Sequence, residues 1–71
     1  MTYRRLKGIL IESNKCRLHN KDTPYEVWYS TITKKYFSFE CWDDNRNCDE
    51  DDIKRILKQA GIERRWRYAK V

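Results

Sequence analysis

Proton-transfer chemistry in this chain depends on a single histidine, His19. Histidine most often serves as a general acid or base, because its ordinary pKa lies close to neutral pH. Tyr25 and Glu26 follow a short turn after His19, and the three side chains form a small acid–base group if the turn brings them together. They are the candidate catalytic residues. The alternative, and the commoner situation for a lone histidine, is that His19 is a solvated residue at a strand end.

Metal binding is the second chemistry to consider, because Cys16, His19, Cys41 and Cys48 are ligand types that suit tetrahedral zinc. Their spacing is not that of a zinc knuckle, and in a regular strand Cys16 and His19 would point to opposite faces. Cys16 and Cys41 also fall on apolar strand faces, where free cysteine packs as a small hydrophobic side chain. We therefore expect no metal site and no cofactor.

Basic residues mixed with aromatic ones are typical of nucleic-acid binding, and residues 63–71 are the densest stretch of this kind. Arginine can hold phosphates, and aromatic rings can stack on unpaired bases. The candidate RNA-binding residues are Arg4, Arg5, Lys34, Lys35, Arg64, Arg65, Trp66 and Arg67. For residues 63–71 the alternative, compatible with the first, is a helical extension that packs through Trp66 and leaves its arginines solvated.

Acidic residues gather separately, six of them within residues 43–52. Part of this run is explained by the helix dipole, which favours acids at the start of the helix that follows. The remainder, beside exposed aromatic residues, is a candidate protein-binding surface. Its residues are Trp42, Asp49, Glu50, Asp51 and Asp52, with Trp28 and Tyr36 as further exposed aromatics. The alternative is a solvated loop that only caps the helix.

Length and composition restrict the class of protein. A chain of 71 residues makes one domain, residues 1–71, with 63–71 as a basic aromatic extension. Its ten aromatic residues suit a small core, and its net charge of +5 favours phosphate-bearing partners. Three cysteines are an odd number, and neither a signal peptide nor a membrane-spanning run is evident. We expect a cytoplasmic protein with free thiols and no membrane contact.

The N-terminal segment is predicted to be a helix that Thr2 caps, with Tyr3, Leu6, Ile9 and Leu10 on one face. Asn14 or Lys15 would then adopt the left-handed turn that ends it. The β-branched residues within 8–11 leave a second possibility open, a strand of a hairpin.

Three strands are predicted next, at Cys16–His19, Tyr25–Thr31 and Tyr36–Trp42, with turns at 20–24 and 33–35. Alternation sets one group of side chains (Tyr25, Val27, Tyr29) against another (Glu26, Trp28, Ser30), and it groups Phe37, Phe39 and Cys41. Glu26 and Glu40 are expected on the same sheet face, either as a pair of carboxylates or as solvated neighbours.

The last helix is indicated most clearly, because Ile53, Ile56, Leu57 and Ala60 form one apolar face and Gly61 follows. A polar loop at 43–47 precedes it, and Asn47 with Glu50, or Asp49 with Asp52, is expected to cap it. The predicted fold is α+β in the order α-β-β-β-α, a three-stranded antiparallel sheet with both helices on one face. Double-stranded-RNA-binding domains have this element order.

The arrangement resembles the HicA family of toxin–antitoxin mRNA interferases over roughly Leu6 to Ile62. Residues 10–18 (LIESNKCRL) are similar to the exit of the family's first helix, and residues 56–62 (ILKQAGI) closely resemble its closing helix. The resemblance implies a small RNA-binding protein that acts on single-stranded or structured mRNA and is partnered by a cognate antitoxin.

The chain departs from the family where activity is concerned. The family carries a Gly-Ser-His triplet at the entry to the second strand, whereas residues 22–28 here read DTPYEVW and contain no histidine. The resemblance therefore implies a divergent or inactive interferase, and whether the chain is an enzyme stays open. A second hypothesis is a small phage- or plasmid-encoded inhibitor, which would bind a host defence or nucleic-acid-processing protein through the acidic residues and exposed aromatics.

Overall fold

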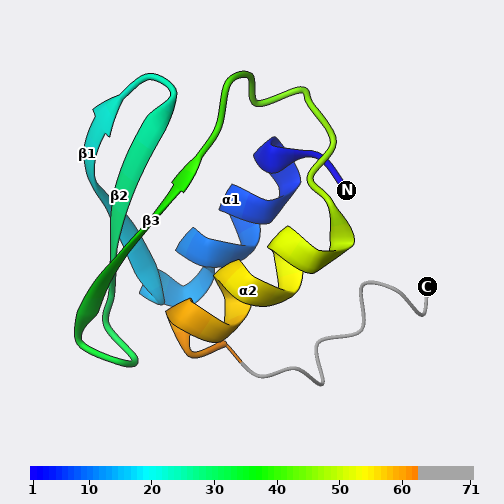
Figure 1. The fold of residues 1–71 in the computed structure, drawn as a ribbon. Helices are drawn as coiled ribbons and strands as arrows, with labels where there is room; N and C mark the ends of the chain where they lie inside the picture. Colours follow the sequence, from blue (N-terminus) through cyan, green and yellow to red (C-terminus); the bar gives the residue numbers. More distant parts are fainter. Residues whose placement is uncertain (63–71) are drawn as a thin grey trace.

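The computed structural model describes residues 1–62 (Figure 1). The elements, in chain order, are α1 (Tyr3–Ile11), a short 3-10 turn η1 (Glu12–Asn14), β1 (Cys16–Asp22), β2 (Tyr25–Ser30), β3 (Lys35–Glu40) and α2 (Glu50–Ala60). The strands form one antiparallel sheet in the order β1-β2-β3, and both helices lie on the same side of it (Figure 1). The predicted α+β fold is confirmed. The binding residues predicted at 64–67 lie outside the described residues.

The N-terminal segment is a helix, so the strand alternative is wrong. Thr2 caps α1, and its hydroxyl accepts a hydrogen bond from the Arg5 amide at 3.3 Å. Leu6, Ile9 and Leu10 are buried, as the helical spacing predicts. Ser13 and Asn14 adopt the left-handed conformation after α1, each with φ of 57°, whereas Lys15 does not.

β1 is longer than the sequence predicts, because it continues through residues 20–22, where a turn is expected. These polar residues pair with β2 in register, Lys21 with Glu26 and Asp22 with Tyr25, and they remain exposed along the sheet edge. Pairing with β2 therefore outweighs the weak intrinsic preference of these residues for strands. A register shift between Leu18 and Asn20 marks a bulge at His19.

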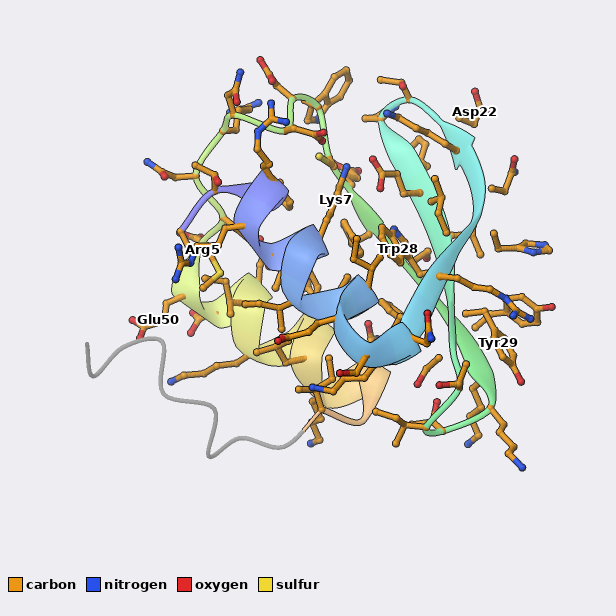
Figure 2. All side chains as sticks on the ribbon, turned by 180° about the vertical axis from the view of Figure 1, so that it is seen from behind. Arg5, Lys7, Asp22, Trp28, Tyr29 and Glu50 are labelled. Atoms are coloured by element: carbon orange, nitrogen blue, oxygen red, sulfur yellow. The ribbon has the colours of Figure 1, made fainter. Side chains whose placement is uncertain are left out.

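The inner face of the sheet, toward the helices, carries Glu26, Trp28, Ser30, Phe37 and Phe39, all of them buried. Trp28 is only 3% exposed, so its prediction as an exposed aromatic is wrong. Its ring stacks on Phe39 with centroids 6.2 Å apart, and Figure 2 shows it directed toward the helices while Tyr29 lies on the opposite face. The prediction that Glu26 and Glu40 share a sheet face is also wrong, because the register places the buried Glu26 opposite Phe39 and the exposed Glu40 opposite Tyr25.

α2 follows the predicted pattern closely. Its four apolar positions are buried, and Gly61 ends it in the left-handed region with φ of 78°. Asp49 occupies the N-cap position without a side-chain hydrogen bond, so neither expected capping box forms. Buried residues from both helices and all three strands join one core cluster. Within residues 1–62 no helix is both long and apolar enough to cross a membrane.

Candidate nucleic-acid interface

The outer face of the sheet carries a row of three facing side chains, one from each strand. Arg17 on β1 pairs with Tyr29 on β2, which pairs with Tyr36 on β3. Cross-strand neighbours on one face lie close enough to interact, and these do. The rings of Tyr29 and Tyr36 meet edge to face with centroids 4.9 Å apart. The Arg17 guanidinium lies 5.2 Å from the centre of the Tyr29 ring.

His19 joins this row from the bulge in β1. Its ring lies edge-on to Tyr36 with centroids 4.8 Å apart, and its side chain is exposed. We call Arg17, His19, Tyr29 and Tyr36 the outer platform. Tyr36 is 60% exposed, so a large part of its ring is open to solvent. Such a surface of aromatic rings and a guanidinium is suited to stacking on flat, unpaired bases.

The basic residues predicted from the sequence do not form one surface. Lys34 and Lys35 lie where the β2–β3 hairpin turns, in the same hairpin as Tyr29 and Tyr36. Arg4 and Arg5 lie in the first turn of α1, and Figure 2 shows Arg5 and Tyr29 on opposite sides of the molecule. Arg4 donates a hydrogen bond to the Asn45 side chain at 2.9 Å. Of the predicted residues described, Lys34 therefore accompanies the outer platform, whereas Lys35 pairs with the inner-face residue Ser30 and lies toward α2.

The predicted acid–base group of His19, Tyr25 and Glu26 is not formed. His19 and Tyr25 are exposed, whereas Glu26 is 1% exposed and belongs to the inner face. The physical reason is the alternation along β2, which turns successive side chains to opposite faces. Of the three candidates, His19 is the one that the structure places on the outer platform.

Glu26 has a different partner, the ammonium of Lys7 from α1. Lys7 Nζ donates to Glu26 Oε2 and to Asp44 Oδ1, both at 2.6 Å, and the Trp28 indole donates to the other Glu26 oxygen at 3.1 Å. Burial opposes the charge on Lys7, but its two carboxylate partners outweigh that effect and raise its pKa above 10.5. The same ammonium lowers the pKa of Asp44. Both oxygens of the buried Glu26 are thus satisfied within the fold.

In this cluster the Lys7 ammonium occupies the place where a metal cation would bind. Glu26, Cys41 and Asp44 offer ligand atoms within 4.8 Å of one another, the one such group among residues 1–62. The Lys7 ammonium bonds both carboxylates, so it supplies the positive charge that a metal ion would otherwise bring. The four residues considered for zinc do not converge, because Cys16 is buried on the inner face and His19 is exposed on the outer one.

The acidic residues considered for protein binding lie around the start of α2. Asp49, Glu50 and Asp51 are exposed, and Trp42 is 61% exposed. Asp52 is partly buried and forms an ion pair with Arg55 at 2.8 Å. The acids therefore occupy the helix N-terminus, where their charge suits the dipole and opposes phosphate.

Arg17 and Tyr29 of the outer platform were not among the candidate site residues. The alternation of β2 groups Tyr29 with Tyr25, but the partner of Arg17 depends on a register that the turn residues did not reveal. A two-residue turn at Thr23–Pro24 by itself would align Arg17 with Ser30, and only the bulge at His19 shifts the register so that Arg17 faces Tyr29. Comparisons of the chain with protein-family models, curated proteins and solved structures found no match.

Proposed function

We propose that the protein binds RNA in the cytoplasm through its outer platform, as a small HicA-like member of a toxin–antitoxin type system. The observation that carries the proposal is the cross-strand contact of Arg17, Tyr29 and Tyr36 on an open sheet face. Each stacked base contributes about 1–3 kcal/mol in proteins that use aromatic platforms. This chemistry suits unpaired bases of a single-stranded or structured mRNA.

The acidic start of α2 supports the choice of the sheet face over the helical face. Double-stranded-RNA-binding domains approach phosphates with a helix N-terminus, which favours anions. Here Glu50, Asp51 and Asp52 fill the first turn of α2 and would repel phosphates. RNA is therefore expected on the opposite side of the sheet, where Arg17 and Lys34 are exposed.

The toxin–antitoxin setting is supported by the likeness of residues 10–18 and 56–62 to the HicA family. A cognate antitoxin is the protein partner that this setting provides. A divergent interferase would rely on His19, since Glu26 is engaged by Lys7. Incubation of purified protein with mRNA tests this point: cleavage that His19→Ala abolishes would make the protein a nuclease, and no cleavage would leave a binding protein.

RNA binding is tested by fluorescence anisotropy with a short labelled oligouridylate. Tyr36→Ala and Tyr29→Ala are each expected to raise Kd about tenfold, the equivalent of roughly 1.4 kcal/mol for a lost stacking contact. Arg17→Ala should weaken binding and reduce its salt dependence. Trp42→Ala is the matched control, because Trp42 is equally exposed but lies outside the outer platform. Equal Kd values for all four variants and the parent would refute the proposal.

A second candidate function, inhibition of a host protein, is favoured by the exposure of Trp42 beside the acids. Asp49, Glu50 and Asp51 have no ion-pair partner within residues 1–62, so their charge is open to a basic partner. A pull-down that recovers a nucleic-acid-processing protein, and loses it when Asp49 and Glu50 are changed to Lys, would favour this function over the first.

A further inference from the structure

β3 is an edge strand with unused backbone hydrogen-bonding groups. Among residues 1–62 it pairs with β2 alone. The Cys41 amide donates to the Pro24 carbonyl at 2.7 Å, and this bond shows which β2–β3 residue pairs are hydrogen-bonded and which are not. Bonded and non-bonded pairs alternate in an antiparallel ladder, so Phe37 and Phe39 bond to β2. The N–H and C=O groups of Tyr36, Ser38 and Glu40 therefore point away from the sheet.

A groove follows this edge between β3 and α2. One section, of about 660 Å³, is lined by Phe39, Ile56 and Asp49 among others, and the next, of about 750 Å³, by Phe37 and Lys58 among others. Ser38 and Arg55 line both sections, so the groove is continuous.

The width of the layers explains why the groove exists. Two helices of about 10 Å diameter cover roughly 20 Å, whereas three strands about 4.8 Å apart cover roughly 14 Å. Both helices lie on one side of the sheet (Figure 1), so α2 extends beyond β3. The uncovered width is that of a single additional strand.

The groove has opposite charges at its two ends. Three acids (Glu40, Asp49, Asp52) and one further base, Arg46, line the end near the C-terminus of β3, which is therefore acidic on balance, and Lys35 and Lys58 line the end near its N-terminus. Between them Arg55 is held by Asp52 at 2.8 Å. The apolar lining of the first section comes from Ile56 and Phe39, which are 1% and 7% exposed.

We propose that this groove binds an extended segment of a partner protein as a fourth strand, antiparallel to β3. An antiparallel segment enters with its N-terminal end beside Glu40 and leaves beside Lys35, so it should be basic at its start and acidic at its end. Alternate apolar side chains would face Ile56 and Phe39. The site adjoins the outer platform, because Tyr36 lines the groove as well, but the proposal does not depend on whether that platform binds RNA.

A second copy of the chain fits the groove less well than a single strand. Two β3 edges paired about a two-fold axis would bring the projecting α2 helices together. Arg55 lies midway between Asp52 and Lys58 on α2, so the two copies of Arg55 would face each other. Like charges directly opposed in an interface are costly.

The test uses two synthetic labelled peptides, Lys-Arg-Val-Thr-Val-Thr-Val-Asp-Glu and a charge-swapped form that begins Glu-Asp and ends Arg-Lys. Anisotropy with the full chain is expected to show the first peptide bound about tenfold more tightly than the second. Lys58→Glu should weaken the first peptide and strengthen the second. Lys54→Glu is the matched control on α2, since Lys54 does not line the groove.

Ser38→Pro tests the strand pairing itself, because it removes an outward N–H that β2 does not use. It should abolish binding of the first peptide, while Ser38→Thr should retain it, both with an unchanged circular dichroism spectrum. If Ser38→Pro does not fold, Lys58→Glu still decides. Equal affinity for the two peptides, or binding insensitive to Lys58→Glu, would overturn the proposal. So would sedimentation showing a dimer that the first peptide fails to dissociate.

Discussion

Lys7 is the residue on which the inner polar cluster depends, because its ammonium is the shared partner of Glu26 and Asp44. A charge as deeply buried as that of Glu26 is tolerated only when it is paired and hydrogen-bonded. The Trp28 indole supplies one further bond to Glu26. The cluster thereby ties α1, β2 and the loop before α2 together at a single point.

Lys7→Met should lower the free energy of unfolding by about 3 kcal/mol, because it leaves Glu26 buried without a counter-charge. Lys54→Met, at an exposed position of α2, should change it by less than about 0.5 kcal/mol. Urea denaturation of the two variants beside the parent measures both values. Similar losses in the two variants would mean that the cluster contributes little.

Acid should weaken the cluster through Asp44. Its pKa is lowered chiefly by the hydrogen bond from Lys7, partly opposed by burial. A carboxyl with a lowered folded-state pKa stabilises the fold above its ordinary value of 3.8, and this stabilisation is lost as pH falls through the folded-state pKa. Denaturation at successive pH values should show the parent more stable than Asp44→Asn at neutral pH, with the difference vanishing in acid. A constant difference would contradict the assignment.

At the scale of the helices, alanine substitutions of the two glycines should change stability in opposite directions. A methyl group at Gly8, in the exposed part of α1, meets nothing within 4 Å. Gly8→Ala should therefore stabilise the protein by about 1 kcal/mol, the helix preference of alanine over glycine. Thermal unfolding should show a higher Tm, and an unchanged or lower Tm would argue against a regular helix there.

Gly61→Ala should destabilise by about 1–2 kcal/mol, because Gly61 ends α2 with a left-handed backbone that alanine resists. The added methyl would also lie 2.6 Å from the Thr33 side-chain methyl in the β2–β3 turn. Ser30 closes the same corner, since its hydroxyl donates to the Ala60 carbonyl at 2.6 Å. A neutral effect of Gly61→Ala in the same melting experiment would contradict this account of the helix end.

The elements with a strong local pattern were predictable, and their tertiary partners were not. α2 follows from its four apolar positions and Gly61, which need no knowledge of the sheet. Alternation sorted the β2 side chains into two groups, but aromatic residues occur in both, so it did not decide which face is buried. A glutamate in this group suggests a solvated face, yet Glu26 is buried, because its counter-charge comes from Lys7 on α1. The bulge at His19 likewise has no clear local signal.

At the scale of the whole molecule, the net charge of +5 conceals a division between two surfaces. Asp49, Glu50 and Asp51 gather at the start of α2, while Arg17, Lys34 and the aromatic rings lie with the sheet, whose exposed acids Asp22 and Glu40 stand at the far ends of β1 and β3. Charge that is separated in this way orients an anionic partner during its approach. RNA is thus expected to meet the outer face of the sheet, leaving α2 and the β3 edge free for a protein.

The most direct test of the outer platform is to titrate the ¹⁵N-labelled protein with a short oligouridylate and map the amide shifts. The largest changes should fall on Arg17, His19, Tyr29 and Tyr36, with smaller ones at the neighbouring turn that carries Lys34. Residues in the first turns of α1 and α2 should remain unchanged. Changes confined to those helix starts, or none on the sheet at saturating RNA, would contradict binding through the outer face.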